Sequence, residues 1–442
     1  MQDTTPHNQA ESIKPQSSGI QEPDSEVLRH RKASYWWNTI AGLLFTAQSV
    51  IMLVVITRVC DVYTAGVFTI AFAVGNLFMN MGMYGMRKFQ ASDRRHEFTF
   101  KEYRNSRAIT SLCMIVASGA YIAYSSVTLS YPPEKTLVIF VMCLFKVVDV
   151  VEDVYSGAYQ VQDRLDVGQK MVSLRQAVTL TAFVVVIMIT ADLGISLIII
   201  TVFTSVFFAG QVVYIRKRYG MPAPSPRMEW RKVGSLLKQC FPLFAAMFLL
   251  FYIGSAPKYA IDAMMDDAAQ AYYGYISMPV FVVNVLATFV YNPMVTELTD
   301  LWQVGHVREF LIRFAKVTGA IAALTAICVI GAWLVGVPVL NILYNTDIAG
   351  YLVELLVLVA GGGFLALATL ANVGITVIRF QRVLVPLYTL MAVVAFLVSN
   401  WTVSLWGVTG ASWAYFSVMA VTAVVFSAAF LVGCKVMRIP RQ

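Results

Sequence analysis

The chain has 442 residues, of which 58% are hydrophobic and only 13% are charged, and its mean hydropathy is +0.68. Soluble globular domains are typically about 45–50% apolar and about 25% charged. Charge this sparse cannot cover the surface of a soluble protein of this length, so the composition predicts a membrane protein. The net charge of +8 could suit a nucleic-acid-binding protein. The basic residues stand between apolar runs, however, where they orient a protein in a bilayer, and we expect no nucleic-acid partner.

The first 33 residues are polar and combine Gln, Ser and Pro with charges of both signs. Such a composition cannot bury a hydrophobic core, so segment 1–33 is predicted to be a disordered cytoplasmic tail. No short apolar stretch follows a charged start near Met1, so a signal peptide is not indicated.

From Ser34 onward the sequence consists of apolar runs separated by short polar segments. Crossing the hydrocarbon layer of about 30 Å takes about 20 helical residues. The runs are continuous and lack the alternation of barrel strands, which favours an all-α, polytopic membrane protein with about twelve transmembrane helices. The helices are expected at 34–57, 65–86, 108–129, 136–160, 171–190, 194–215, 235–257, 271–295, 314–336, 351–378, 383–400 and 407–433.

The basic residues predict the orientation of these helices. If the N-terminus is cytoplasmic, 29 of the 33 Lys and Arg residues fall in cytoplasmic segments. The outer connections hold only Arg58, Lys135 and Lys258, and Lys146 lies within a helix. Cytoplasmic loops of membrane proteins carry an excess of Lys and Arg. We therefore expect a multi-pass protein of the plasma membrane with both termini in the cytoplasm.

A basic segment with three prolines, around 216–234, separates six predicted helices from six. The predicted organisation is an N-terminal six-helix lobe at 34–218, a cytoplasmic linker at 219–234, a C-terminal six-helix lobe at 235–435 and a cytoplasmic tail at 436–442. Two pseudo-symmetric six-helix bundles with a cleft between them are typical of a transporter. A channel or a non-transporting scaffold is the alternative.

The fourth predicted helix, 136–160, contains Lys146, Asp149, Glu152 and Asp153 within an apolar run. At 100° per residue these four side chains share one face of the helix. Charges inside a membrane are costly and normally face protein or water. They can form an ion-coupling site or polar wall of a transport cleft, or an internal ion-pair network such as Lys146 with Asp149. The sequence leaves both interpretations open.

Four cations are candidates for binding an anionic substrate. Arg58 and Lys258 occupy corresponding places at the outer ends of the first helix of each half, and Arg87 and Lys88 end the second helix. Arginine matches the geometry of phosphate groups. Orientation and contact with lipid headgroups are the alternative explanations, and for Lys258 pairing with the nearby acidic residues is another.

No enzyme is indicated, because nucleotide-binding and hydrolase motifs are missing from the sequence. The six cysteines show no CxxC pairing, and the four histidines are not spaced like a ligand pair. We therefore expect neither a metal site nor a cofactor.

Two segments resemble a known family. Residues 85–93 read GMRKFQASD, which is similar to a cytoplasmic loop of the polysaccharide-exporting flippases, part of the multidrug/oligosaccharidyl-lipid/polysaccharide exporter superfamily. Residues 152–160 read EDVYSGAYQ and continue to RLDV at 164–167, which resembles the end of the fourth helix of that family.

The resemblance implies two six-helix bundles that carry an undecaprenyl-diphosphate-linked oligosaccharide to the outer leaflet for surface polysaccharide or lipopolysaccharide biosynthesis. It implies a cationic cleft formed chiefly by helices one, two, seven and eight, and partners that include a polysaccharide polymerase and glycosyltransferases. The predicted helices one and seven contain no Asp or Glu, unlike many cation-coupled drug exporters. Export of cationic drugs or metabolites, or a scaffold role in glycan synthesis, is the alternative.

Overall fold

The computed structural model describes residues 25–93, 97–220 and 229–437, and the structural statements below concern these residues. Every regular element within them is helical, which confirms the predicted all-α class. Residues 1–24 of the predicted tail, the middle of the predicted linker and residues 438–442 lie outside the described part.

The first group of helices comes from the N-terminal half of the chain. Its elements are α1 (Ser25–Val59), α2 (Val62–Met83), α3 (Met86–Ser92), α4 (Phe100–Thr128), α5 (Pro133–Val161), α6 (Leu165–Thr190) and α7 (Leu193–Tyr219).

The second half is more broken, and prolines separate several of its helices. Its elements are α8 (Trp230–Met264), α9 (Asp267–Ser277), α10 (Val280–Tyr291), α11 (Met294–Gln303), α12 (Val307–Gly331), a π-helix (Ala332–Gly336), α13 (Val337–Tyr344), a 3-10 turn (Ala349–Tyr351), α14 (Leu352–Val377), a second 3-10 turn (Gln381–Val383) and α15 (Leu384–Val436).

Ten segments of the described chain are long and apolar enough to cross a membrane. Helix α5 is not among them, although its 29 residues exceed the length that is needed, because it carries the charges at 146–153. The segment Gln381–Val436 has 56 residues, enough for two crossings. Adding α5 and dividing this segment gives the twelve crossings expected from the sequence.

The division of α15 occurs at Gly407. Its φ of 55° and ψ of −129° are not helical, and they turn the chain between the two parts of α15. A residue with a side chain is strained at such a positive φ, whereas glycine adopts it readily. The predicted helices at 383–400 and 407–433 therefore correspond to the two arms of α15.

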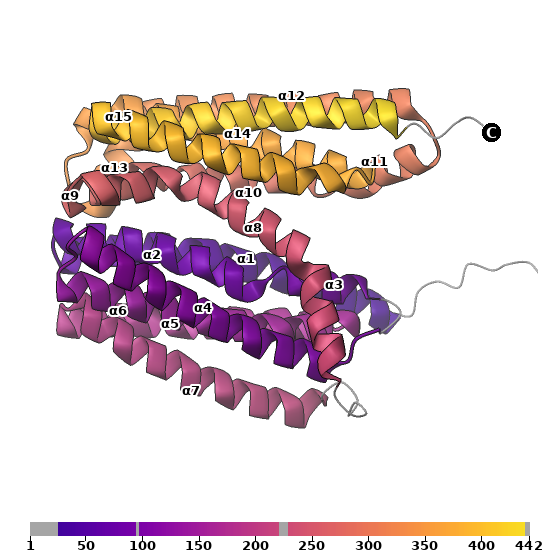
Figure 1. Ribbon diagram of the computed structural model, residues 1–442, viewed down its shortest axis with the longest axis horizontal. Coiled ribbons are helices and arrows are strands. Elements are labelled where there is room, and N and C mark those ends of the chain that lie inside the picture. The colour runs from indigo at the N-terminus through magenta and orange to yellow at the C-terminus, as the bar shows by residue number, and fades with distance from the viewer. Residues whose placement is uncertain (1–24, 94–96, 221–228, 438–442) are drawn as a thin grey trace, which may run out of the picture.

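Figure 1 shows the helices running roughly alongside one another, with α1, α2 and α4–α7 on one side and α12, α14 and α15 on the other. Helix α8 runs obliquely between them and contacts α2, α3 and α4 as well as α9 and α15. The other main contacts between the two sides are those of α2 with α9 and of α1 with α13. We call the end of the molecule with α3 and α11 the basic end, because α3 carries Arg87 and Lys88. The opposite end, with α9 and α13, is called the far end.

Acidic residues begin three helices at the far end. Asp61, Asp192 and Asp266 accept hydrogen bonds from backbone N–H groups at the starts of α2, α7 and α9, at 2.8, 2.8 and 2.9 Å. These N-caps satisfy backbone donors that have no partner within the helix. Hydrogen bonding by Thr64 also holds the pKa of the Asp61 carboxyl below its ordinary value.

Three predicted boundaries differ from the structure. Residues 25–33 are the start of α1 and not a disordered tail, and α8 begins at Trp230, inside the predicted linker. Helix α8 also continues through Pro257 to Met264, so Lys258 lies within a helix and not in an outer connection. Proline interrupts the hydrogen-bond ladder but is tolerated in membrane helices, where neighbouring helices compensate. The limits of the two predicted lobes remain predictions.

Candidate functional site: a cavity between the two helix groups

A cavity of about 430 Å³ lies between the two groups of helices. Its lining comes from α1 and α2 on one side and from α8, α9, α10, α14 and α15 on the other. Aromatic rings are frequent in this lining, at Phe72, Phe251, Tyr273, Phe281 and Tyr415. Hydroxyl and amide groups complete it, at Ser49, Asn76, Ser255, Ser277, Asn284 and Thr369.

Lys258 is the single charged residue among the described residues that line this cavity. Its side chain is half-buried, and the described part of the chain offers it no ion pair. An ammonium group that is withdrawn from water and lacks a counter-ion attracts an anion strongly. The cavity can therefore hold an anionic group beside Lys258, with aromatic and amide groups around it.

Arg87 and Lys88 lie in a different cavity, of about 380 Å³, toward the basic end. Arg87 donates to Gln160 Oε1 at 3.1 Å and lies 3.6 Å from Asp153, whereas Lys88 is exposed. Met247 of α8 also lines this cavity, so both halves of the chain contribute to it. Lys88 is thus accessible to an anion from solvent, and Arg87 is already partly neutralised by Asp153.

Arg58 lines neither cavity. It lies in the last turn of α1 and donates to the backbone carbonyls of Leu343, at 2.9 Å, and Ile342. These carbonyls belong to the last turn of α13, where intrahelical partners are missing. The structure therefore separates Arg58 from Lys258, and places Arg58 in a contact between α1 and α13.

The four charged residues at 146–153 of α5 are brought together with cations from other helices. Arg175 of α6 donates to Glu152 at 2.7 Å and also to Asp149, and Lys146 lies 3.5 Å from Asp149. Lys146 further donates to Gln48 of α1 at 2.9 Å and lies over the ring of Phe72 at 4.4 Å. Lys146, Glu152 and Arg175 are no more than 2% exposed. The charges balance, because two cations face two carboxylates.

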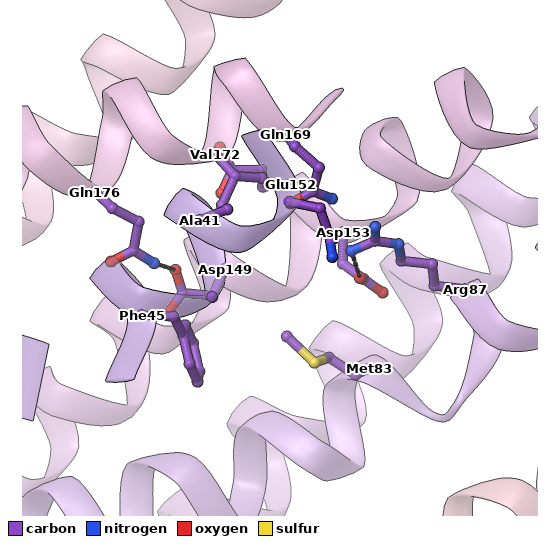
Figure 2. Close-up of a pocket in the computed structure, with 12 residues that line it drawn as sticks. Ala41, Phe45, Met83, Arg87, Asp149, Glu152, Asp153, Gln169, Val172 and Gln176 are labelled. Atoms are coloured by element: carbon purple, nitrogen blue, oxygen red, sulfur yellow. Dashed lines mark hydrogen bonds and ion pairs between the residues drawn. The ribbon is translucent and has the colours of Figure 1, made fainter. Parts of the chain in front are cut away.

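Asp153 continues this network toward the basic end. It accepts from Arg107 of α4 at 2.7 Å, and Arg107 also donates to the Gly82 carbonyl at 2.8 Å. Figure 2 shows Asp153 turned toward Arg87, and Gln176 turned toward Asp149, around a third cavity of about 260 Å³. One oxygen of Glu152 and one of Gln176 have no hydrogen-bond partner in the described structure, and both residues line this cavity.

Three buried basic residues are among those that the sequence places outside the membrane. Arg107 and Arg175 belong to the 29 cations expected on the cytoplasmic side, and Lys135 is expected in an outer connection, but all three lie within helices and are at most 5% exposed. The charged face of α5 is a signal that cationic partners exist on neighbouring helices. It does not indicate which of the many basic residues they are.

Comparisons with known proteins agree with this architecture. No family model matches the chain, and no curated protein matches it at a significant level. Among solved structures, the lipid II flippase MurJ in an inward closed conformation is similar at a TM-score of 0.67 and 11% identity, over 92% of this chain and 87% of that one.

Two further structures match over most of their length. The Vibrio cholerae MATE transporter VcmN in its bent form is similar at a TM-score of 0.59 and 12% identity, over 93% of this chain and 98% of that one. A MOP superfamily transporter from Pyrococcus furiosus is similar at 0.57 and 14% identity, over 94% and 96%. The chain therefore has the fold of the MOP superfamily transporters.

Proposed function

We propose that the chain transports an undecaprenyl-diphosphate-linked oligosaccharide from the cytoplasmic to the outer leaflet of the plasma membrane by alternating access. The observation that supports this most directly is the cavity between the helix groups, whose described lining contains the unpaired cation Lys258 and no acidic residue. A cationic drug would be repelled from such a site, whereas a diphosphate would be attracted.

The surroundings of Lys258 suit the rest of such a substrate. Aromatic rings such as Phe72 and Tyr415 offer flat apolar faces to sugar rings, and Asn76 and Asn284 can bond to sugar hydroxyls. The lipid tail would stay in the bilayer. By the distribution of Lys and Arg, the basic end faces the cytoplasm, and Lys88 beside Arg87 would meet the diphosphate first.

The similar structures support a transporter but not a single substrate class, since they include both MATE transporters and a lipid II flippase. The Pyrococcus furiosus transporter is described as having a binding pocket of reverse polarity, so pocket charge differs among proteins of this fold. For this chain, the charge of the cavity favours an anionic substrate.

For the α5 network we propose mainly a structural role, because its buried charges are paired. The second candidate, ion-coupled export of cationic drugs or metabolites, is favoured by the unpartnered oxygens of Glu152 and Gln176 in the third cavity. On that hypothesis Asp149→Asn abolishes efflux of a cationic dye. A scaffold that assembles a polymerase and glycosyltransferases without transport fits less well with a polar cavity between the halves.

The proposal is tested with purified protein in proteoliposomes that contain a fluorescent polyprenyl-diphosphate oligosaccharide. Lys258→Ala is expected to lower the rate of flipping at least about tenfold, the effect of losing one charge-assisted hydrogen bond of about 1.5–3 kcal/mol. Lys258→Arg keeps the charge and is the matched control. Unchanged flipping by Lys258→Ala, or dye efflux that depends on Asp149, would contradict the proposal.

A further inference from the structure

Lys258 and Asp262 lie four residues apart on α8, yet they are not paired. Residues at this spacing lie on the same face of a helix and readily form ion pairs. Asp262 is bound instead to Lys135, at 2.8 Å, and accepts a hydrogen bond from the Tyr131 hydroxyl. Lys135 also pairs with Asp267 at 2.7 Å. Because these partners hold Asp262, Lys258 remains available in the cavity.

The contacts of Lys135 join the two helix groups at the far end. Lys135 begins α5 of the first group, whereas Asp262 ends α8 and Asp267 begins α9. The joint is tightly packed, since a Cβ on Gly66 of α2 would lie 1.7 Å from the Asp267 carbonyl oxygen. Lys135 and Asp262 are only 5% and 8% exposed. If the two groups separate here, Asp262 loses its ion pair with Lys135.

An acid and a base four residues apart on one helix attract each other when neither has another partner. The nearest cation to Asp262 along its own helix is Lys258, one turn away. We propose that Asp262 is a shared counter-ion, paired with Lys135 while the far end is closed and with Lys258 when it opens. Opening the far end thereby neutralises the cation that holds the anionic substrate, and this exchange drives release on that side.

The charge balance supports the exchange. With the far end closed, Lys135 pairs with the carboxylates of both Asp262 and Asp267, and Lys258 faces the cavity with no acidic residue in its described lining. After separation, the second group keeps Lys258, Asp262 and Asp267, which together carry one negative charge. Asp266 adds another, although its side chain caps α9. An anion that was attracted to the closed cavity is then repelled from the open one.

This inference rests on the proposed function for the role of Lys258 as an anion-binding residue. Its test measures binding of geranylgeranyl diphosphate to the purified full-length chain by isothermal titration calorimetry, with uncharged geranylgeraniol as the reference ligand. Lys135→Ala frees Asp262 and is expected to weaken diphosphate binding about tenfold. Lys135→Ala combined with Asp262→Asn removes the competitor and is expected to restore affinity to within about twofold of the natural chain.

The matched control is Glu134→Gln, which removes an exposed charge next to Lys135 and should leave binding unchanged. Affinity in the double variant as low as in Lys135→Ala would show that Lys135 only supports the structure, and would overturn the inference. If Lys135→Ala does not fold, the single variant Asp262→Asn provides the test. Shared pairing predicts that its affinity for geranylgeranyl diphosphate equals or exceeds that of the natural chain. A purely structural role of Asp262 predicts a loss of affinity. Normal binding by Lys258→Ala would instead overturn the proposed function.

Discussion

Arg175 donates from two of its nitrogens to a single carboxylate oxygen of Glu152, at 2.9 and 2.7 Å. The same guanidinium contacts Asp149, so one side chain of α6 holds two acids of α5. Arg175 and the two acids are almost fully buried. The contact therefore positions α5, the most highly charged helix of the first group, against its neighbour.

Replacing Arg175 with Met should destabilise the protein severely. Two buried carboxylates would then share Lys146 alone, and breaking a buried ion pair by removing one partner costs about 3–5 kcal/mol. Urea unfolding of the purified protein in detergent measures the change. Arg175→Met combined with Glu152→Gln should recover part of the loss. Equal stability of Arg175→Met and the natural chain would contradict the network.

Arg107 and Asp153 should show strong energetic coupling. Their 2.7 Å ion pair joins α4 to α5, and Arg107 is only 1% exposed. In a double-mutant cycle of Arg107→Met and Asp153→Asn, a coupling energy of at least about 1 kcal/mol is expected. Arg104→Met changes an exposed arginine of the same helix and should have little effect. Strict additivity of the Arg107 and Asp153 changes would show that the pair does not matter.

Gly66→Ala should prevent the far end from closing as it does here. A methyl group at this position would lie 1.7 Å from a backbone oxygen of α9, and neither backbone can yield easily. Hydrogen exchange followed by mass spectrometry should show faster exchange in residues 267–277. Gly42→Ala is the control, since nothing lies within 4 Å of a Cβ placed there. Exchange as slow as in the natural chain would show that α2 and α9 do not need this close approach.

Arg58→Ala should release the end of α13 without weakening diphosphate binding. The Arg58 side chain is engaged with the carbonyls of Ile342 and Leu343 and lies outside the cavity of Lys258. Faster hydrogen exchange in residues 337–344 is expected, together with unchanged affinity for geranylgeranyl diphosphate. A loss of affinity like that of Lys258→Ala would restore Arg58 to the substrate site, where the sequence first suggested it.

The sequence predicts the helical class and the number of crossings well, because about 20 apolar residues in a row have few other structures available in a membrane. The ion pair of Lys146 with Asp149, which the sequence offers as one of two interpretations, is present in the structure, because these residues are neighbours on one helix. The sequence does not predict the partners that come from other helices. Arg107 and Arg175 look like ordinary cytoplasmic cations, because the excess of Lys and Arg on the cytoplasmic side of membrane proteins explains their presence equally well.

Lys258 shows the same limitation. From the sequence it stands at a helix end with three acids nearby, and pairing with them is a natural expectation. In the structure α8 continues past it, Asp266 caps α9 and Lys135 takes Asp262 and Asp267. Lys135 is far from these acids in the sequence, so only the packing of α5 against the second group reveals why Lys258 stays unpaired.

The turn at Gly407 gives the last two crossings an unusual mechanical property. The two arms of α15 meet without an intervening loop, so there is no slack to absorb a change in tilt of one arm. A Cβ on Gly407 would also lie 2.9 Å from the Met265 side chain, in the connection between α8 and α9. A displacement of that connection would press directly on the bend. The last two crossings are therefore joined directly at the far end, at a bend that lies against the connection between α8 and α9.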